Sequence, residues 1–320
     1  MESRSATGLK ILINYDFPPE LRARAEALAP SAEFHGPEEL QARPGLLGEI
    51  EIIYGHLAPE DWPRAHRLQW LQSAGAGVDS LLTPDVVAHP ARLTNVHIHG
   101  EAIAEQLFGM LLALTRGLHV ACRQQAQRVW ARERINDQTL SGRTLGVLGL
   151  GAVGGRAAEL GVAFGMRVLG VRRQARETAG VERVYGPSER MEMLSGCDFV
   201  MNTLPLTEET RKFLGREEFA AMPPGALVFN IGRGGTVDTE VLVEALRSGH
   251  LGGAGLDVTD PAPLPPEHPL WGMENVILTP HSAGGHRDYA QHVGAVFLEN
   301  LRRYLAGEPL TSQVDKVAGY

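Results

Sequence analysis

Four side chains that can hold an anion or move a proton stand at or just after the ends of apolar runs in the second half of the sequence. They are Arg233, in a glycine turn, His281, after a proline, and the acids Asp257 and Asp260. An arginine can bind a carboxylate and polarise a carbonyl, and a histidine can supply a proton as the carbonyl is reduced. The set suits reduction of a 2-keto acid, although each residue taken singly also fits an ordinary strand end.

A glycine loop that suits a dinucleotide lies upstream. The motif Gly-x-Gly-x-x-Gly spans 149–154, directly after the apolar run 144–148 and before a stretch of helical character. The first glycine permits a tight turn, the second admits a phosphate to the backbone, and the third lets helix pack on strand. Helix amides then face a pyrophosphate, and the expected cofactor residues are Gly149, Gly151, Ala152 and Gly154. A purely structural glycine turn is the alternative.

The next apolar run, 167–171, ends in Arg172 and Arg173. An NAD site usually has an acid near this point, which binds the ribose 2′-hydroxyl. An adenosine 2′-phosphate carries about two negative charges, which a guanidinium binds through two parallel hydrogen bonds. Because two arginines stand where an NAD site usually has an acid, the sequence predicts NADP as the cofactor, with NAD as the second choice. A solvated strand end is the alternative interpretation of the two arginines.

The elements that must position these side chains alternate along the chain from about residue 144. Apolar strands are predicted over 144–148, 167–171, 199–204, 226–231, 253–258 and 276–279, with helices between them. This alternation predicts a parallel, doubly wound sheet, whose ligands bind beyond the carboxyl ends of the strands. Shorter strands and helices over 10–95 indicate a second sheet.

The length of 320 residues suffices for two domains. The predicted fold is α/β, with two doubly wound parallel-sheet domains of Rossmann or flavodoxin type, the second inserted in the first. We expect a substrate-binding domain over residues 1–97 and 286–320, and a dinucleotide-binding domain over residues 98–285. A long apolar helix over 103–118 is expected to link the two, and a last helix over 287–305 carries the chain back.

The composition argues against several classes of protein. A net charge of −8 favours neither nucleic acid nor an anionic membrane as a partner, and no apolar run is long enough to span a bilayer. Cys122 and Cys197 are the only cysteines, which fits neither a disulfide framework nor a zinc site and indicates a reducing cytoplasm. His97 and His99 lack an obvious third ligand, so no metal site is predicted.

Together the motifs resemble the D-isomer-specific 2-hydroxyacid dehydrogenase family, and within it the glyoxylate/hydroxypyruvate reductase-like branch. The resemblance runs from about residue 68 almost to the C-terminus. Besides the glycine loop it rests on the segments 72–79, 104–105, 204–207, 230–234, 256–259 and 280–281. The resemblance also implies a homodimer.

The resemblance assigns roles to residues of these motifs. It implies that Ala76 and Gly77 offer backbone amides to the substrate carboxylate, and that Arg233 and His281 are catalytic. Cofactor contacts are implied for Val153, Leu204, Pro205, Thr207, Ile231, Gly232, Arg233, Asp257 and His281, and for Ala283 and Gly284 in the turn that follows.

One position departs from the family pattern. Members of this kind have a glutamate, which pairs with the catalytic histidine, where this chain has Ala262 between two prolines. A partner carboxylate raises the pKa of a histidine and selects its tautomer, and a methyl group does neither. Either the activity is weakened, or another acid takes over (Asp260, or with less support Glu267), or the position has been altered.

Three functions are compatible with the sequence. The leading hypothesis is an NADPH-dependent reductase of small 2-keto acids, such as glyoxylate or hydroxypyruvate, that forms the D-hydroxy acid. A second is a dinucleotide sensor or scaffold of weakened activity, because the family includes transcriptional corepressors and the acidic partner is missing at Ala262. Arg233 and His281 argue against it, since a binding module needs neither. A third is a relative that oxidises formate or phosphite through a different substrate pocket.

Overall fold

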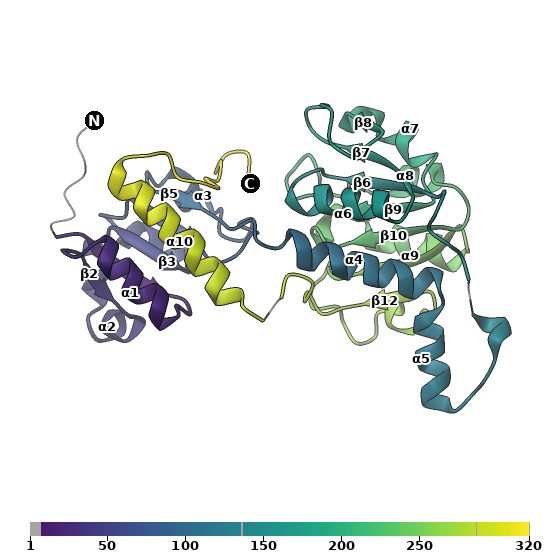
Figure 1. Ribbon diagram of the computed structural model, residues 1–320, viewed down its shortest axis with the longest axis horizontal. Helices are drawn as coiled ribbons and strands as arrows, with labels where there is room; N and C mark the ends of the chain where they lie inside the picture. The colour runs from purple at the N-terminus through teal and green to yellow at the C-terminus, as the bar shows by residue number, and fades with distance from the viewer. Residues whose placement is uncertain (1–7, 136, 286, 320) are drawn as a thin grey trace. The chain divides into compact units, whose positions relative to one another are not determined.

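The computed structural model describes residues 8–135, 137–285 and 287–319 (Figure 1). The chain divides into two compact units, Met1–Ile98 with His286–Tyr320, and His99–Gly285. Each is an α/β domain built on a parallel sheet, and the second is inserted in the sequence of the first. The fold class predicted from the sequence is therefore confirmed. The predicted boundary at residue 286 lies outside the described residues.

The first unit has a five-stranded sheet in the order β2-β1-β3-β4-β5. Its strands are β1 (Lys10–Asn14), β2 (Glu33–His35), β3 (Ile52–Gly55), β4 (Trp70–Ser73) and β5 (Arg92–Thr94). Its helices are α1 (Pro19–Leu28), α2 (Pro37–Ala42), α3 (Pro84–Ala88) and α10 (Tyr289–Ala306), with 3-10 turns η1 (Pro44–Glu49) and η2 (Pro59–Arg64). Because successive strand side chains point to opposite faces, Ile11 and Ile13 pack with α1 and α10, whereas Leu12 packs in the cluster on the other face.

The second unit has a seven-stranded sheet in the order β12-β11-β10-β9-β6-β7-β8. Its strands are β6 (Thr144–Leu148), β7 (Arg167–Val171), β8 (Arg183–Tyr185), β9 (Phe199–Asn202), β10 (Ala226–Asn230), β11 (Leu251–Leu256) and β12 (Val276–Leu278). Its helices are α4 (Gly100–Thr115), α5 (Leu118–Gln127), α6 (Ala152–Ala163), α7 (Arg190–Leu194), α8 (Arg216–Ala221) and α9 (Thr239–Arg247). Side chains of α4 and α6 pack on one face of the sheet, and those of α7, α8 and α9 pack on the other.

The winding of the second sheet reverses at β6, which lies between β7 and β9. Ligands of such sheets bind beyond the carboxyl ends of the strands at this reversal. Parallel pairing brings the carboxyl ends of β7, β6, β9, β10, β11 and β12 into one row, in that order. The loops that leave these ends carry the residues predicted for the site.

The helix predicted over 103–118 is divided in two. Helix α4 ends at Thr115, and α5 begins at Leu118 after Gly117, whose φ of 64° lies in the left-handed region. Glycine adopts this conformation without a steric penalty, so the chain turns here. Helix α4 packs with α6 in the core of the second unit, whereas α5 extends away from the body of that unit (Figure 1).

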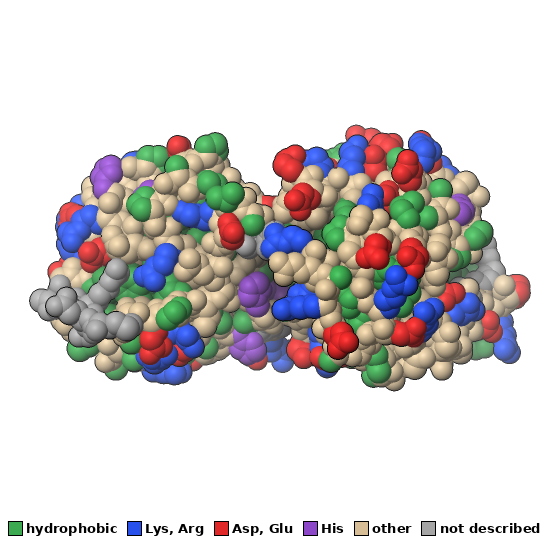
Figure 2. All heavy atoms as spheres, turned by 90° about the horizontal axis from the view of Figure 1, so that it is seen from above, with side chains coloured by type: hydrophobic (Ala, Val, Ile, Leu, Met, Phe, Trp, Pro, Cys, Tyr) green, Lys and Arg blue, Asp and Glu red, His purple; other side chains and the backbone are tan. Residues whose placement is uncertain are grey.

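The surface carries charges of both signs. On the face drawn in Figure 2, acidic and basic side chains are interspersed over each unit. No helix among the described residues has both the length and the apolar character needed to cross a membrane.

Candidate active site

The glycine loop joins β6 to α6 and leaves room for a ligand. Gly149 has a φ of 90°, the left-handed conformation that the tight turn requires. A Cβ at Gly154 would lie 1.8 Å from the carbonyl oxygen of Gly149, so only glycine lets α6 approach the loop. Around Gly151, in contrast, a Cβ would meet no atom within 4 Å. A phosphate can therefore approach the backbone here, at the amino terminus of α6, which starts with Ala152 and Val153.

The end of β7 lies beside this loop. The N–H of Gly149 donates to the carbonyl oxygen of Val171 at 2.9 Å, and Arg172 and Arg173 follow immediately. The N–H of Arg172 donates to the carbonyl oxygen of Tyr185 at 3.1 Å, which holds the backbone against β8. The side chain of Arg172 is partly exposed, and no hydrogen bond or ion pair to it is recorded among the described residues. Its guanidinium is therefore available to an anionic ligand.

Buried amides shape the next two strand ends. Asn202 ends β9 and Asn230 ends β10, and both are almost fully buried. Asn202 Nδ2 donates to Asn230 Oδ1 at 3.1 Å and to Thr236 Oγ1 at 2.6 Å. The amide oxygens of the two asparagines accept from the N–H groups of Leu204 and Gly232, each at 3.2 Å. One buried network thus holds in place both the loop after β9 and the loop after β10.

These two loops contain the candidate cofactor residues Leu204, Pro205, Thr207, Ile231 and Gly232. A Cβ at Gly232 would lie 2.5 Å from the carbonyl oxygen of Leu204, so the loops lie against each other. In the first loop, Thr210 Oγ1 donates to the carbonyl oxygen of Pro205 at 2.6 Å and accepts from the N–H of Thr207 at 2.8 Å. The loops that follow β9 and β10 are therefore closely packed against each other.

Arg233 lies between β10 and the 3-10 turn η5 (Gly234–Thr236) and is half-buried. Its carbonyl oxygen accepts from Asn230 Nδ2 at 3.1 Å and from Thr236 Oγ1 at 2.6 Å. Its guanidinium donates to the carbonyl oxygen of Gly232 at 2.8 Å. Both the backbone and the side chain of Arg233 are thus held by the buried amide network and its neighbours.

The loop after β11 lies against the Arg233 turn. A Cβ at Gly234 would lie 2.0 Å from the carbonyl oxygen of Thr259. Asp260 Oδ2 is 3.6 Å from the Cβ position of Gly235, so this carboxylate faces the same turn. Glu267, the other acid considered as a substitute for the missing glutamate, is exposed.

The carboxylate of Asp257 organises the turn that carries His281. Asp257 is 3 % exposed, and its Oδ1 accepts from Thr279 Oγ1 at 2.6 Å and from the N–H of Ser282 at 2.9 Å. Its Oδ2 accepts from the N–H of Ala283 at 3.1 Å, and its carbonyl oxygen accepts from the N–H of His281 at 3.0 Å. Charge-assisted hydrogen bonds are stronger than neutral ones. They hold His281 at a φ of 52°, which is uncommon for a residue with a side chain.

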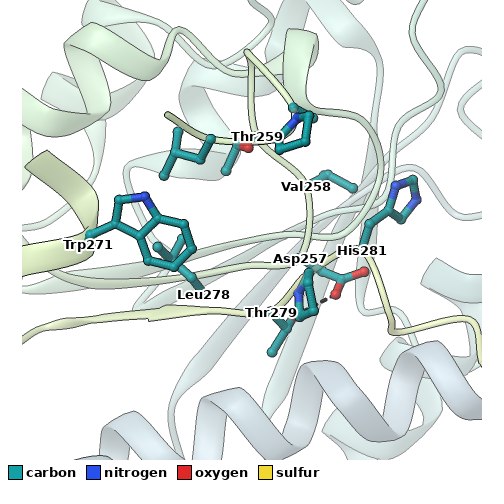
Figure 3. A pocket seen from close by; sticks show the side chains of 11 residues that line it. Asp257, Val258, Thr259, Trp271, Leu278, Thr279 and His281 are labelled. Carbon is teal, nitrogen blue, oxygen red and sulfur yellow. Dashed lines mark hydrogen bonds between the residues drawn. The ribbon is translucent and has the colours of Figure 1, made fainter. Parts of the chain in front are cut away.

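A cavity of about 600 Å³ lies beside His281 (Figure 3). Its walls are mostly apolar, from side chains that include Val258 and Leu278, and the indole of Trp271 closes one side. Ala262 and His281 both line this cavity, so the position at which the glutamate is missing borders the same cavity as the histidine. Among the described residues no hydrogen bond or ion pair to the His281 ring is recorded, and its side chain is exposed.

The last candidate of this turn, Gly284, lies against His99. A Cβ at Gly284 would lie 2.9 Å from Cδ2 of the His99 ring. No group of three or more His, Cys, Asp or Glu side chains that could hold a metal ion occurs within the described ranges.

The two predicted carboxylate contacts, Ala76 and Gly77, belong to the first unit, in the loop that follows β4. The carbonyl oxygen of Ala76 accepts from Asn95 Nδ2 at 2.7 Å. For the N–H groups of Ala76 and Gly77, no acceptor is recorded among the residues that the structure describes. Both groups are therefore available to an anion.

Sequence reasoning missed the polar side chains that hold the loops, above all Asn202, Asn230 and Thr236. A usable signal was present, because two successive apolar runs each end in an asparagine. Short amide side chains at strand ends commonly bond the backbone of the loop that follows. Trp271 was missed as well, and nothing in its local sequence indicates that it faces a cavity.

Comparison with known proteins identifies the family. The model of the D-isomer specific 2-hydroxyacid dehydrogenase, NAD binding domain, matches residues 108–283. A glyoxylate reductase of Aeropyrum pernix is 34 % identical over 255 residues, which cover 77 % of this chain and 76 % of that protein.

Solved structures agree. A D-isomer specific 2-hydroxyacid dehydrogenase family protein from Aeromonas salmonicida has a TM-score of 0.84 and 36 % identity, over 97 % of this chain and 100 % of that one. An NADPH-dependent glyoxylate/hydroxypyruvate reductase from Sinorhizobium meliloti, in complex with NADP and sulfate, has a TM-score of 0.83 and 29 % identity, over 98 % and 100 %. The chain belongs to the D-isomer specific 2-hydroxyacid dehydrogenase family, as its motifs predicted.

We predict that Asp257→Asn destabilises the second unit by about 2 kcal/mol. The amide nitrogen would face an N–H or O–H donor where the carboxylate accepts, in a site closed to water. Urea denaturation followed by circular dichroism measures the change. Thr279→Val is the matched control, because it removes one of the three hydrogen bonds and should cost about 1 kcal/mol. Equal stability of the asparagine variant and the native protein would contradict the role given to Asp257.

Proposed function

We propose that the protein is an NADPH-dependent reductase that converts a small 2-keto acid, such as glyoxylate or hydroxypyruvate, into the D-2-hydroxy acid. The observation that carries the proposal is the row of strand ends in the second unit. Arg172, the glycine loop, Leu204, Arg233, Asp260 and His281 follow the ends of β7, β6, β9, β10, β11 and β12 in turn. Groups suited to phosphate stand at one end of this row, and groups suited to proton transfer stand at the other.

The first end of the row suits the adenosine part of NADPH. The open backbone at Gly151 and the amino terminus of α6 would hold the pyrophosphate. Arg172 stands one residue after Val171, whose carbonyl binds the glycine loop, and we propose that its guanidinium binds the 2′-phosphate of the adenosine ribose. A 2′-phosphate would then meet a cation where an NAD enzyme has an acid. The NADP-bound neighbour from Sinorhizobium meliloti supports this choice.

The other end suits the reaction. NADPH, when bound, would supply the hydride for the reduction. Arg233 holds the substrate carboxylate and polarises the carbonyl. The family resemblance also implies carboxylate contacts for the N–H groups of Ala76 and Gly77 of the first unit. His281 donates a proton to the carbonyl oxygen, so that the carbonyl group becomes an alcohol once a hydride has been added to its carbon. Asp260 is the acid of the same loop that we propose in place of the glutamate missing at Ala262.

The test is a steady-state assay of a panel of 2-keto acids with NADH and with NADPH. We expect glyoxylate or hydroxypyruvate to be reduced, with the higher kcat/KM for NADPH. Tight binding of NADPH without turnover of any keto acid would contradict the proposal and favour a sensor or scaffold instead. The sensor or scaffold remains the second candidate because no carboxylate partner of the His281 ring is recorded among the described residues.

We predict that Arg172→Asp reverses the preference for NADPH. A well-made guanidinium–phosphate contact contributes about 1.5–3 kcal/mol, so the ratio of kcat/KM for NADPH to that for NADH should fall roughly 10-fold to 100-fold. The control is Arg247→Asp, which makes the same charge change at an exposed position in the last turn of α9. An unchanged ratio in the Arg172 variant would remove the basis for assigning the 2′-phosphate to this residue.

We predict that Ala262→Glu extends activity to higher pH and raises the rate about 10-fold. A carboxylate beside an imidazole favours the charged imidazolium, so the proton donor stays populated as the pH rises. The measurement is a pH–rate profile with one keto acid, and Ala262→Gln is the matched neutral control. An unmoved profile and an unchanged rate would mean that another acid already serves His281. Asp260→Asn then tests whether Asp260 is that acid, and full activity of this variant would exclude Asp260 as the partner of His281.

We further propose a homodimer formed through α5 and the segment that follows it. This arm extends from the body of its unit (Figure 1), and it exposes 99 % of Trp130 together with 52 % of Leu118 and 43 % of Val129. Exposed apolar side chains gathered in this way mark an interaction surface. Sedimentation should give a dimer for the native protein and a shift toward monomer for Trp130→Asp, and a monomeric native protein would contradict the proposal.

We propose that the protein is cytoplasmic. Both cysteines are free thiols, with Cys122 exposed and Cys197 buried. Burial raises the pKa of the Cys197 thiol to about 12, so this thiol is unreactive. An exposed free thiol such as Cys122 suits a reducing compartment.

A further inference from the structure

The loop after β4 in the first unit is held through its carbonyl oxygens. The carbonyl of Ala74 accepts from Tyr289 Oη at 2.8 Å, that of Gly75 from the N–H of Val96 at 3.4 Å, and that of Ala76 from Asn95 Nδ2 at 2.7 Å. The three donors come from the start of α10 and from the segment after β5. Three successive peptide groups are thus anchored by residues that are distant in the sequence.

This anchoring fixes the direction of the N–H groups. In a trans peptide the C=O and the N–H of the next residue point in opposite directions. Because the carbonyls of Gly75 and Ala76 point toward residues 95–96, the N–H groups of Ala76 and Gly77 point away from them. No acceptor for either N–H is recorded among the described residues. Two adjacent N–H groups aimed outward form a small anion-binding concavity of the kind called a nest.

The position of this nest suits a ligand. It follows the carboxyl end of β4, and ligands of parallel sheets bind beyond such ends. Ala76 is half-buried and Gly77 is exposed, so an anion can approach from solvent. A carboxylate that accepts two backbone N–H groups makes charge-assisted hydrogen bonds, which are about twice as strong as neutral ones.

We propose that Asn95 and Tyr289 are positioning residues for the substrate carboxylate. Asn95 aims the N–H of Gly77 through the carbonyl of Ala76, and Tyr289 fixes the peptide group at Ala74, from which the loop toward Ala76 and Gly77 starts. The proposal rests on the proposed function, because it takes the 2-keto acid as the ligand of this nest. Neither side chain touches the substrate, and each acts through a carbonyl oxygen of the loop.

The surroundings of Asn95 make it a firm anchor. Asn95 is 5 % exposed, its N–H donates to the carbonyl oxygen of Ser312 at 3.1 Å, and its carbonyl oxygen accepts from Gln72 Nε2 at 3.0 Å. Gln72 Oε1 in turn accepts from Asn300 Nδ2 at 2.9 Å and from Thr94 Oγ1 at 2.8 Å. A buried network that spans β4, β5 and α10 therefore keeps the backbone of Asn95 in one place, and from there its side-chain Nδ2 reaches the carbonyl of Ala76.

Tyr289 is suited to the second anchor. It is the first residue of α10, and its ring packs edge-on against Tyr15 with the ring centroids 6.5 Å apart. Burial raises the pKa of Tyr289 to about 12, so its hydroxyl stays protonated and remains a donor at any pH at which the protein would work.

The experiment measures the affinity of the full-length protein, saturated with NADP⁺, for oxalate. Oxalate offers a carboxylate like that of a 2-keto acid and cannot be reduced. By calorimetry we expect Tyr289→Phe and Asn95→Ala each to bind oxalate roughly 10-fold more weakly than the native protein. The matched control, Tyr304→Phe on the same helix, should bind as the native protein does.

A kinetic measurement separates positioning from general damage to the fold. In both variants the KM for glyoxylate should rise roughly 10-fold, while the KM for NADPH and kcat change little. Tyr289→Phe keeps the shape of the side chain, so it carries the test alone if Asn95→Ala fails to fold. If Tyr289→Phe binds oxalate as tightly as the native protein, the role of Tyr289 is overturned. If a folded Asn95→Ala does so, the role of Asn95 is overturned.

The proposed function fails separately. A native protein that binds oxalate but reduces no 2-keto acid would refute the reductase, and the affinities of the variants would still decide the role of the two anchors. A native protein that binds no oxalate would overturn the anchoring proposal itself.

Discussion

Parallel pairing of the strands is the constraint on which the site depends. It forces each strand of the second unit to end at the same edge of the sheet, so that loops far apart in the sequence leave side by side. The same pairing in the first unit places the loop after β4 at the corresponding edge of its own sheet. Among the described residues, those of the candidate site are attached to one of these edges, and most of the helices between strands cover the faces of the sheets.

Loops alone would not hold such side chains in place, and short buried polar groups supply the rigidity. The amide oxygens of Asn202 and Asn230 accept from the N–H groups of the second residues of the loops after β9 and β10, and the carboxylate of Asp257 accepts from two N–H groups of the turn after β12. In the first unit Asn95 does the same for a carbonyl. These groups are buried, so each unmade hydrogen bond would cost about 1–3 kcal/mol. Stability and the geometry of the site are therefore set by the same contacts.

The sequence predicted the parts of this arrangement that follow from local rules. Apolar runs located six of the seven strands of the second unit, and the short edge strand β8 was missed. The glycine spacing located a turn in which Gly149 adopts a positive φ and Gly154 touches the loop backbone. The break in the helix at Gly117 was missed, because the apolar pattern continues across it while the backbone does not. The anchors of the loops were missed for a different reason. Tyr289 and its acceptor Ala74 lie 215 residues apart, and no periodicity connects them. The roles of the individual site residues are still predictions from the family resemblance and the geometry.

The central claim is that the row of strand ends delivers a proton from His281 to a substrate reduced by NADPH. The most direct measurement is kcat/KM for glyoxylate with NADPH in His281→Asn, with the dissociation constant for NADPH determined on the same samples. Loss of a general acid should lower the rate about 10²-fold to 10⁴-fold, while NADPH binds as it does to the native protein. A variant that reduces glyoxylate as fast as the native protein would contradict the account.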